Sequence, residues 1–497
     1  MKSQLLTAQR RTPRLRRIAA LGALGVVALL PGCGGDSTDN AGTDGTVTAS
    51  NCPVGEFDKA SSPTTIKLWH SYVGKAKTTL EALAAKYNAT QPKVKVEVES
   101  QGTSYVELLR NFKNALPTKN LPAITIGEDI DTQYMADSGV VLPAAECQAA
   151  DPAAAEQTQD ILPAVKAAYT VKGVQYPASM NVSTIVLYYN KEHFRKAGLD
   201  PEKPPTTLAE VKAAAEKLKA SGASKQPFVM KLDPWFIEQW TTGAGQAMVD
   251  QNNGRDGTAT AATLTNPATT EALNWVASMK TADLLNGVPG TDGQINHYLA
   301  MATGSSSMLL ETSAAITTIN GVLEGSFDPK DLGSDLQLPP GFKVSIDLGV
   351  GLNPGLTEPG KGQIGGGAWY ITNTGTPEVQ SAAWDFVKFF NTTASQVQWT
   401  TDGGYLPILE SAKSDPTLKS DWETSRRGKW LATAYGGIAT LDANFPGALI
   451  GPYDQFRDEF RKTVEGVGLN ASPVDSSLAT ANAAITQLLD AYKANQF

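Results

Sequence analysis

Short apolar runs and amphipathic stripes alternate along most of the chain. Residues 66–69 form one apolar run, and the continuously apolar residues 185–189 form another, which is typical of a strand covered on both faces. Val94, Val96 and Val98 alternate with charged or polar residues, as expected for a half-buried strand. The pattern therefore predicts a strand at each of these three places.

Helices are predicted wherever apolar residues recur three and four positions apart. Because such helices alternate with strands, the pattern predicts an α/β fold with mostly parallel sheets. One of the helices is expected to stop before Gly222. The stripes are formed by Leu80, Leu83, Ala84 and Tyr87; by Leu208, Val211, Ala215 and Leu218; by Phe456, Phe460 and Val464; and by Ile485, Leu488, Leu489 and Tyr492.

The first 32 residues are typical of a secretory signal. Six basic residues and no acidic one accompany an apolar stretch at 18–30, which is too short to span a bilayer as a stable helix. The arginine pairs leave open whether export follows the general or the twin-arginine route. The stretch ends in Leu30-Pro31-Gly32-Cys33, which resembles the lipobox of bacterial lipoproteins. We therefore expect Cys33 to carry lipid; the alternative is an ordinary secreted protein with an incidental cysteine.

Residues 33–58 are expected to comprise the lipidated cysteine and a flexible tether, because they are rich in Gly, Ser, Thr and Asp and lack periodicity. No later stretch reaches the length of a membrane span, so the lipid is the only expected attachment to the bacterial cell membrane, on its extracytoplasmic face. That compartment is oxidising. We expect the two remaining cysteines, Cys52 and Cys147, to form a disulfide, with two unpaired thiols as the alternative.

Composition excludes several classes of protein. The chain has 497 residues, 41% of them hydrophobic, which is enough for two or three lobes. Its formal charge is −8, and removing the signal leaves 36 basic against 50 acidic residues, a charge of about −14 that argues against nucleic acid as a partner. With three Cys and three His residues, the chain has little capacity for a soft metal, so we expect no metal and no cofactor.

Catalytic motifs are missing from the sequence. It contains no Gly-x-Ser-x-Gly elbow, no His-Glu-x-x-His pair, no phosphate-binding Gly-rich Lys loop and no Cys-x-x-Cys. Glu128 and Asp129 are adjacent on an expected strand, so their side chains point to opposite faces and do not flank one bond. Glu311 is a distant second carboxylate, which leaves a secreted glycosidase as one alternative; a structural or adhesion lipoprotein is another. We expect no enzyme activity.

Polar and aromatic residues gather directly after several of the expected strands. In open α/β sheets, ligands bind at the carboxyl ends of the strands. The placement therefore predicts a solute cleft lined by the segments 69–72, 127–129, 233–235, 365–369 and 403–407.

From residue 65 to nearly the end, the chain resembles the extracellular family 1 solute-binding proteins of bacterial ABC importers, which bind oligosaccharides and sn-glycerol-3-phosphate. It is most similar to the glycerol-phosphate branch of that family. The most specific stretch runs from Val182 through Tyr188-Tyr189-Asn190-Lys191 to Gly222. Supporting stretches are 68–71, 252–257, 364–366 and 404–408.

The resemblance implies a two-lobe, periplasmic-binding-protein-like (Venus flytrap) α/β fold with discontinuous lobes and a hinge. We place one lobe at 60–180 plus 306–365 and the other at 181–305 plus 366–497. A monomer of this kind closes on one solute and delivers it to ABC permease subunits and their ATPase. Closure is expected to be a population shift, since contacts from both lobes are complete only when the cleft is shut.

The resemblance also implies a set of ligand-binding residues. In the glycerol-phosphate branch a Tyr, a Glu and an aromatic residue hold the polyol end, and two Ser, a Gly and a Tyr take part in the phosphate grip. The stacking Trp of that branch falls on Leu232 here. Beside these matches we expect contacts from neighbouring acidic and aromatic side chains. The resulting set is Tyr105, Glu128, Asp129, Ser183, Leu232, Trp235, Ser313, Gly366 (or Gly365), Trp369 and Tyr405.

One departure from the residue pattern of the glycerol-phosphate branch determines which solute we expect. The phosphate-binding Arg of the branch falls on Leu449, and a phosphate enclosed without a charged partner leaves its desolvation uncompensated. Arg457 and Arg461 follow on a helix, but their spacing with Phe456 predicts an ordinary helix surface. We therefore expect an uncharged sugar or polyol, with a glycerophosphodiester or glycerol 3-phosphate as the alternative.

Overall fold

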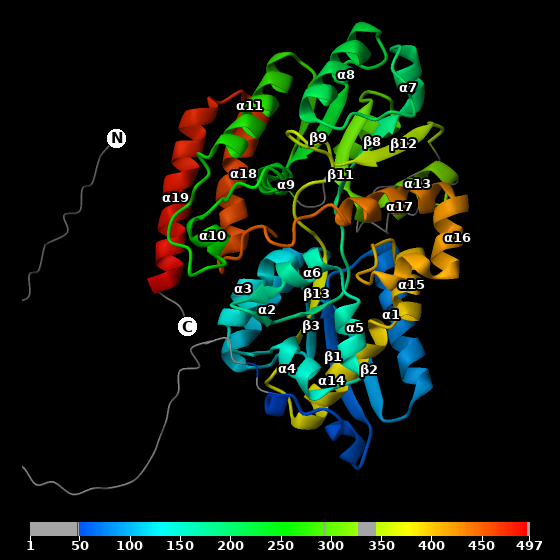
Figure 1. Cartoon of the computed structure of the whole chain (residues 1–497), viewed down its shortest axis with the longest axis vertical. Coiled ribbons are helices and arrows are strands. Elements are labelled where there is room, and N and C mark those ends of the chain that lie inside the picture. The colour runs from blue at the N-terminus through cyan, green and yellow to red at the C-terminus, as the bar shows by residue number, and fades with distance from the viewer. Residues whose placement is uncertain (1–46, 48, 292–294, 327–343, 495–497) are drawn as a thin grey trace, which may run out of the picture. The chain divides into compact units, whose positions relative to one another are not determined.

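The computed structural model describes residues 47, 49–291, 295–326 and 344–494. Its strands form two larger sheets, and each sheet carries its own helices, so the described chain has two α/β lobes (Figure 1). The expected signal at 1–32 and the expected lipidation site Cys33 lie outside the described residues.

The first lobe is built on a six-stranded sheet with the order β2-β1-β3-β13-β4, in which β7 also pairs with β13. Strand β1 is parallel to β2 and β3, whereas β13 is antiparallel to β3. The alternation of buried and outer positions along β1 follows the period of two that the sequence shows. The strands are β1 (Thr64–His70), β2 (Val94–Ser100), β3 (Ile124–Glu128), β4 (Val141–Leu142), β7 (Ala178–Ser179) and β13 (Gly367–Thr372).

The second lobe is built on a five-stranded sheet with the order β10-β9-β11-β8-β12. The apolar run at 185–189 becomes β8, which is buried along its whole length because helices cover both faces of this sheet. A separate two-stranded sheet joins β5 (Thr170–Val171) and β6 (Val174–Gln175). The strands of the larger sheet are β8 (Ile185–Asn190), β9 (Phe228–Leu232), β10 (Leu285–Pro289), β11 (Met308–Thr312) and β12 (Leu348–Leu352).

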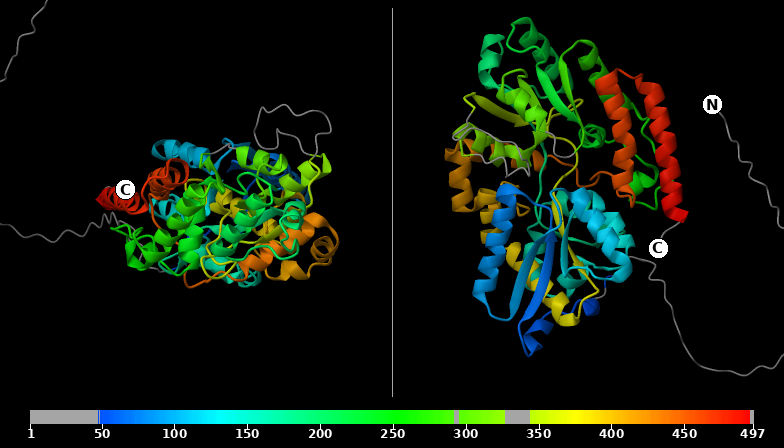
Figure 2. Two further views of the ribbon diagram at one scale, coloured as in Figure 1. Left: turned by 90° about the horizontal axis from the view of Figure 1, so that it is seen from above. Right: turned by 180° about the vertical axis from the view of Figure 1, so that it is seen from behind.

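The helices of the first lobe include the predicted stripe at 80–87, whose four apolar residues are all buried in α1. Helices α18 and α19, the two C-terminal stripes, pack against each other on the second lobe and are seen in orange and red from behind in Figure 2. The first-lobe helices are α1 (Gly74–Thr90), α2 (Tyr105–Ala115), α3 (Thr132–Asp137), α4 (Ala144–Ala150), α5 (Ala154–Gln159), α6 (Pro163–Ala168), α14 (Pro377–Phe390) and α15 (Thr393–Gln398). The remaining helices are α7 (Lys191–Lys196), α8 (Leu208–Ala220), α9 (Pro234–Gly243), α10 (Asp250–Gly254), α11 (Pro267–Thr281), α12 (Asn296–Ala302), α13 (Ile316–Glu324), α16 (Pro416–Thr424), α17 (Arg426–Ile438), α18 (Tyr453–Asn470) and α19 (Val474–Ala494).

Both sheets are mixed, which corrects the expectation of mostly parallel sheets. The strands that run against their neighbours are β8 in the second sheet and β13 in the first. Each is the first strand that the chain enters after crossing from the other lobe. Such a strand begins at the sheet edge where β3 and β11 end, as the pairing of Gly367 with Glu128 and of Ile185 with Thr312 shows, so it runs in the opposite direction.

Three segments cross between the lobes and lie side by side as a hinge. Val182 and Leu406 exchange backbone hydrogen bonds of 3.3 and 3.0 Å, and Ser183 and Gly365 exchange bonds of 2.8 and 3.0 Å. The hinge thus consists of backbone ladders between 181–184, 363–366 and 404–408.

The expected lobe boundaries are corrected at two places. The division after residue 180 agrees with the sheets, since β7 belongs to the first and β8 to the second. The expected return at 306 is wrong, because β11 and β12 stay in the second sheet with β8. The expected second crossing at 366 runs the other way, since β13 and α14 complete the first lobe. An apolar strand at 308–312 suits the interior of either sheet, so its hydrophobic pattern does not reveal its lobe.

The last part of the expected tether is folded against the first lobe. Cys52 is joined to Cys147 with their Cα atoms 5.0 Å apart, which confirms the expected disulfide. Short 3-10 helices at Ala49–Asn51 and Glu56–Lys59 flank Cys52 and pack on α4 and α14. The expectation of a flexible tether is therefore wrong for 49–58.

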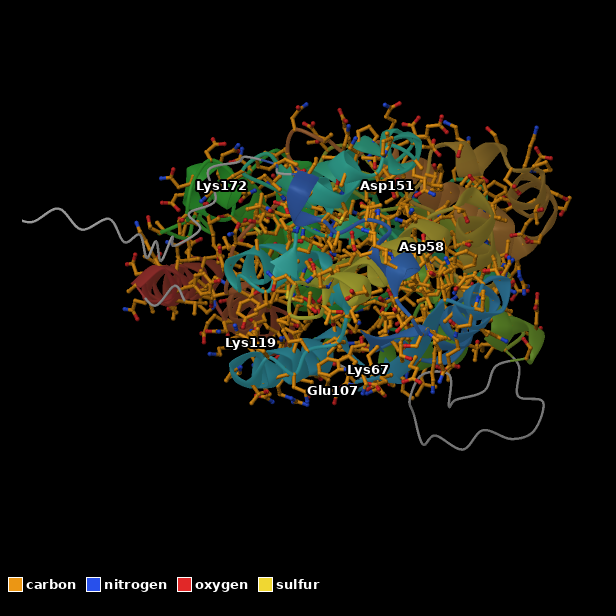
Figure 3. The ribbon with its side chains drawn as sticks, turned by 90° about the horizontal axis from the view of Figure 1, so that it is seen from below. Asp58, Lys67, Glu107, Lys119, Asp151 and Lys172 are labelled. Atoms are coloured by element: carbon orange, nitrogen blue, oxygen red, sulfur yellow. A yellow bond between two sulfur atoms is a disulfide. The ribbon has the colours of Figure 1, made fainter. Side chains whose placement is uncertain are left out.

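The outer end of the first lobe carries charges of both signs. Figure 3 shows Asp58, Lys67, Glu107 and Lys119 on the face seen from below. Lys67 is exposed and lies 2.8 Å from Glu99, an ion pair in contact with solvent.

Candidate functional site

The carboxyl ends of two parallel strands place the first group of expected site residues. Strand β1 ends at His70 and β3 at Glu128, and because the strands are parallel these ends lie at one edge of the sheet. Asp129 begins a 3-10 turn, Asp129–Asp131, in which the Asp131 carboxylate accepts a hydrogen bond from the Glu128 backbone N–H at 2.8 Å. This turn carries the chain away from the sheet directly after Glu128.

Four aromatic side chains, Tyr72, Tyr105, Trp399 and Tyr405, pack together close to this edge. The centroid of the Tyr72 ring lies 6.0, 5.4 and 5.6 Å from the other three, in that order. The Tyr105 hydroxyl donates a hydrogen bond to the Tyr72 hydroxyl at 3.0 Å, and the Asn181 amide donates to the same oxygen at 2.7 Å. Burial raises the pKa of Tyr405 to about 12, so its hydroxyl stays protonated at neutral pH.

Glycines allow the crossing segment to pass close to this aromatic cluster. A Cβ atom on Gly367 would lie 2.7 Å from the Tyr72 hydroxyl and 2.8 Å from the Tyr105 hydroxyl. Gly366 has a φ of +125°, a conformation that favours glycine, and its carbonyl accepts a hydrogen bond from the Asp129 N–H at 3.2 Å. Gly366 therefore connects the hinge to Asp129 through its backbone.

Ser183, Ser313 and Trp235 come from the hinge and the second lobe. Ser183 pairs with Gly365, and the Ser313 hydroxyl, directly after β11, accepts a hydrogen bond from the Thr184 N–H at 3.1 Å. Trp235 is the second residue of α9 and is half-buried. A Cβ atom on Gly365 would lie 2.8 Å from the Trp235 ring. Consecutive residues 365–367 therefore contact Trp235, Asp129 and the tyrosines, which brings the residues from both lobes to one strip of backbone.

Leu232 and Trp369 do not belong to this group, which corrects two of the expected site residues. Leu232 is the last residue of β9, has no exposed surface and packs where Gly468 of α18 leaves room for it. Trp369 in β13 is fully buried, and its ring centroid lies 5.9 Å from that of Phe386 and 4.8 Å from that of Phe390. Both side chains fill hydrophobic cores, so neither lines a solute site.

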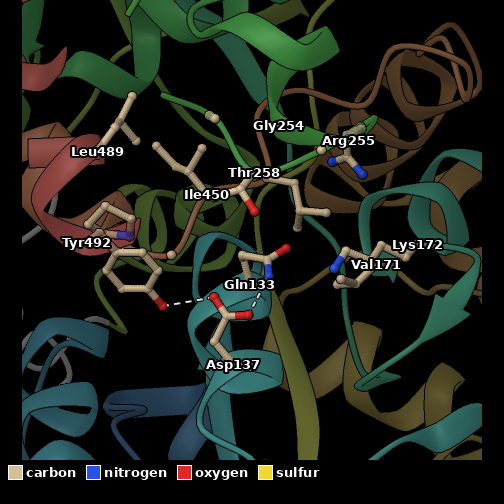
Figure 4. Close-up of a pocket in the computed structure, with 15 residues that line it drawn as sticks. Gln133, Asp137, Val171, Lys172, Gly254, Arg255, Thr258, Ile450, Leu489 and Tyr492 are labelled. Atoms are coloured by element: carbon tan, nitrogen blue, oxygen red, sulfur yellow. Dashed lines mark hydrogen bonds between the residues drawn. The ribbon is translucent and has the colours of Figure 1, made fainter. Parts of the chain in front are cut away.

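Leu449 lines a small pocket between α3 and α19 (Figure 4). Its volume is about 30 Å³, which is room for roughly two water molecules rather than a solute. Next to it, the Tyr492 hydroxyl donates to Asp137 at 2.9 Å, and Arg255 donates to the Ala167 carbonyl at 3.1 Å. These hydrogen bonds join the two lobes beside Leu449.

Arg457 of α18 reaches the site, which corrects the expectation that it lies on an ordinary helix surface. Its side chain is only 12% exposed; Nη1 lies 3.1 Å from Glu128 Oε1 and Nη2 lies 2.8 Å from Glu238 Oε2. Arg457 thus links the second lobe to the carboxyl end of β3. Helical spacing misses this contact because the acidic partners lie on other elements, far away in the sequence. Arg461 does pair locally, with Asp458.

Two buried polar atoms, Asp129 Oδ1 and the Tyr169 hydroxyl, have no hydrogen-bond partner within the described ranges. Burial and the charge of Glu128 raise the pKa of Asp129, while Arg457 opposes the rise. Burial also raises the pKa of Tyr169, with the charge of Asp129 as the next cause, so the two groups are within electrostatic reach. A hydroxyl donor and a carboxyl oxygen left unpaired in this way can both be satisfied by a ligand hydroxyl.

Glu311, the second carboxylate of the glycosidase alternative, is committed to other partners. It lies on β11 and is 2% exposed, with Oε2 2.8 Å from His297 Nε2 and 3.7 Å from Lys231 Nζ. Burial opposes its ionisation, but Lys231 and His297 hold the pKa of Glu311 at about 2. It is therefore a structural carboxylate of the second lobe, and it does not form a catalytic pair with Glu128.

Asn181, Glu238 and Trp399 help to build the site but were not among the expected residues, whereas Tyr72 lies in the expected segment 69–72 without having been singled out. Tyr72 follows the end of β1, the same signal that singles out Glu128. Glu238 is a lone acid in the apolar run of α9, a weaker signal, and Asn181 has none. Among the described side chains, no group of three His, Cys, Asp or Glu residues could hold a metal ion. The described helices also include none with the length and apolarity needed to cross a membrane.

Comparison with known proteins agrees with this architecture. The sequence profile of the bacterial extracellular solute-binding proteins matches residues 82–425. The chain is 26% identical over 381 residues to the sn-glycerol-3-phosphate-binding periplasmic protein UgpB of Escherichia coli O6:K15:H31 (strain 536 / UPEC). That alignment covers 75% of this chain and 81% of the relative.

Two solved structures share the fold. The GacH receptor of Streptomyces glaucescens, solved unliganded and with acarbose, is 22% identical and has a TM-score of 0.68, with 86% of this chain and 99% of that chain covered. UgpB of Mycobacterium tuberculosis, solved in complex with glycerophosphocholine, is 18% identical and also has a TM-score of 0.68, with 87% and 100% covered. Since the family profile spans well over half of the sequence, the chain belongs to the bacterial extracellular solute-binding protein family, whose members bind solutes rather than catalyse reactions.

Proposed function

We propose that this chain captures an uncharged, hydroxyl-rich solute, a sugar or a polyol, between its two lobes and delivers it to the permease of an ABC importer. The observation that carries the proposal is the strip 365–367, whose consecutive glycines lie against Trp235 of the second lobe and against Asp129 and Tyr105 of the first. Carboxylate and hydroxyl groups bind sugar hydroxyls, and aromatic rings stack on the apolar faces of sugar rings.

The charges around Glu128 support an uncharged solute. Leu449 supplies no cation, Arg255 beside it donates to the Gly447 and Ala167 carbonyls, and Arg457 is occupied by Glu128 and Glu238. A phosphate monoester close to dianionic would therefore lose its hydration without gaining a charged partner. The E. coli relative is named for binding sn-glycerol-3-phosphate, but this chain departs from the glycerol-phosphate pattern at Leu232 and Leu449.

A glycerophosphodiester with a cationic head group is the second candidate. The carboxyl groups of Glu128, Asp129 and Glu238 outnumber the single guanidinium of Arg457, and tyrosine rings lie beside them. Aromatic rings and carboxylates together attract quaternary ammonium groups. The M. tuberculosis neighbour was solved with a solute of this class.

Location and partners complete the proposal. The family is extracytoplasmic, which fits the signal expected at 1–32. Attachment through a lipid at Cys33, docking of a monomer on permease subunits and coupling to their ATPase are the finer parts of the proposal. They would deliver the solute from the cell surface into the transporter.

A thermal-shift panel of sugars, polyols, glycerophosphodiesters and sn-glycerol-3-phosphate tests the proposal. At a hundredfold excess over Kd, a bound solute stabilises the folded protein by about 2.7 kcal/mol, so one neutral class should raise the melting temperature clearly. Glu128→Gln removes a charged acceptor, and a tenfold weaker Kd would cut this gain to about 1.4 kcal/mol. Glu97→Gln, on the exposed surface of the same lobe, is the matched control and should leave the shift unchanged. A panel without any response would contradict the proposal.

A further inference from the structure

Glu238 is a fully buried acid that accepts hydrogen bonds from one arginine, one tyrosine and one glutamine. Its Oε1 accepts a hydrogen bond from Arg457 Nε at 3.0 Å, and its Oε2 accepts one from Nη2 at 2.8 Å. The Tyr453 hydroxyl and the Gln363 amide also donate to Oε2, each at 3.3 Å. These contacts join α9, α18 and the hinge, so the position of the carboxylate is determined by three separate elements.

The Glu238 carboxylate occupies the Nε–Nη2 edge of the Arg457 guanidinium, which would otherwise be available to bind an anion. A guanidinium recognises a phosphate through two parallel N–H groups on one edge. The edge formed by Nε and Nη2 faces Glu238, and Nη1 faces Glu128 at 3.1 Å. Burial would lower the pKa of Arg457, but the charges of Glu238 and Glu128 raise it well above its ordinary value. The arginine is therefore a permanent cation that is already neutralised.

Position 449 is a leucine and supplies no cation, but Arg457 places a guanidinium in the site. That guanidinium is already paired with Glu238 and Glu128. Arg457 touches Glu128, one of the expected solute contacts, so an anion bound there would lie close to the guanidinium. Two carboxylates against one guanidinium leave a negative balance, and Asp129 adds a third carboxyl group beside them.

We propose that Glu238 is the specificity-determining residue of the solute site: by occupying the Nε–Nη2 edge of Arg457, it excludes phosphate monoesters and reserves the site for uncharged solutes. Glu238 acts through Arg457 and does not touch the solute itself. The inference rests on the proposed function, since it assumes that Glu128 contacts the solute.

The test is Glu238→Gln, which keeps the shape of the side chain and its contact with Tyr453 but removes the charge. Titration calorimetry with sn-glycerol-3-phosphate should show at least a tenfold gain in affinity over the wild-type protein. Affinity for the neutral solute found in the thermal panel should change by less than about threefold. A merely structural role for Glu238 would produce no gain for the anion.

Glu465→Gln is the matched control, because it makes the same charge change on α18, where Glu465 accepts a hydrogen bond from the Gly290 N–H instead of from Arg457. An equal gain in this variant would assign the effect to bulk charge and overturn the inference. So would a folded Glu238→Gln protein that gains no affinity for the phosphate, whether or not it keeps the neutral solute.

If Glu238→Gln does not fold, Glu238→Asp is the variant that tests the inference. It keeps the charge but withdraws the carboxylate by one methylene, so a gain of at least threefold for sn-glycerol-3-phosphate is expected, and no gain overturns the inference. Wild-type protein that binds no neutral solute would contradict the proposed function. If the wild-type protein binds a neutral solute and the variants gain no affinity for sn-glycerol-3-phosphate, only the role of Glu238 is contradicted.

Discussion

Trp369→Ala is expected to lower the free energy of unfolding by about 3–5 kcal/mol, the cost of emptying a buried tryptophan site. The ring is fully buried in β13 and packs edge-on against Phe386 and Phe390 of α14. Urea unfolding followed by circular dichroism measures the loss, which corresponds to a fall in melting temperature on the order of 10 °C. Solute affinity, measured at a temperature where the variant is folded, should stay unchanged.

Trp235→Ala is the matched control for this prediction. Its half-buried ring stands against Gly365 at the hinge, so truncation should cost no more than about 1–2 kcal/mol of stability. Solute binding should weaken instead. If Trp369→Ala lost solute affinity while keeping its stability, the assignment of Trp369 to the core would be wrong.

Glu311→Gln is expected to cost about 3 kcal/mol of stability at pH 7, since the pKa of Glu311 is held at about 2 and each pKa unit is worth about 1.4 kcal/mol. Because the pKa is lower in the folded than in the unfolded chain, this stability is present above about pH 4.5 and is lost as the pH falls towards about 2. The variant should therefore be destabilised at pH 7 and approach the wild type under acid conditions.

Urea titrations at pH 7, 4 and 3 measure this convergence, because the difference is lost mainly below about pH 4.5. Glu358→Gln, an exposed carboxylate 3.9 Å from Lys361, is the control and should change stability by less than about 0.5 kcal/mol at each pH. A constant difference between Glu311→Gln and wild type across this range would contradict the role assigned to the contacts of Glu311 with Lys231 and His297.

The regular elements could be predicted from the sequence because burial imposes a period on them. The stripe Leu80, Leu83, Ala84 and Tyr87 is buried in α1, and the apolar run at 185–189 is buried in β8. The lobe to which β11 belongs could not be predicted in the same way. Sheet membership depends on long-range strand pairing, and an apolar strand satisfies the interior of either lobe.

Apart from the residues implied by the family resemblance, the candidate site could be predicted only where its residues follow strand ends. Glu128 and Trp235 were found by that signal, which also points to Tyr72. The same signal failed for Trp369, because residues 367–369 begin β13 instead of following a strand, and the Trp369 side chain lies on a buried face. Arg457 and Glu238 were missed because a buried ion pair between separate helices leaves no periodic trace. Their pairing is a property of tertiary structure and changes the charge that a solute meets.

Calorimetric titration of the purified protein with neutral sugars and polyols beside sn-glycerol-3-phosphate shows directly whether the site accepts uncharged solutes and refuses a phosphate monoester. We expect one solute of the neutral class to bind per chain, and the phosphate to give no heat of binding at millimolar concentration. Tight binding of sn-glycerol-3-phosphate, with every neutral sugar and polyol ignored, would contradict this expectation.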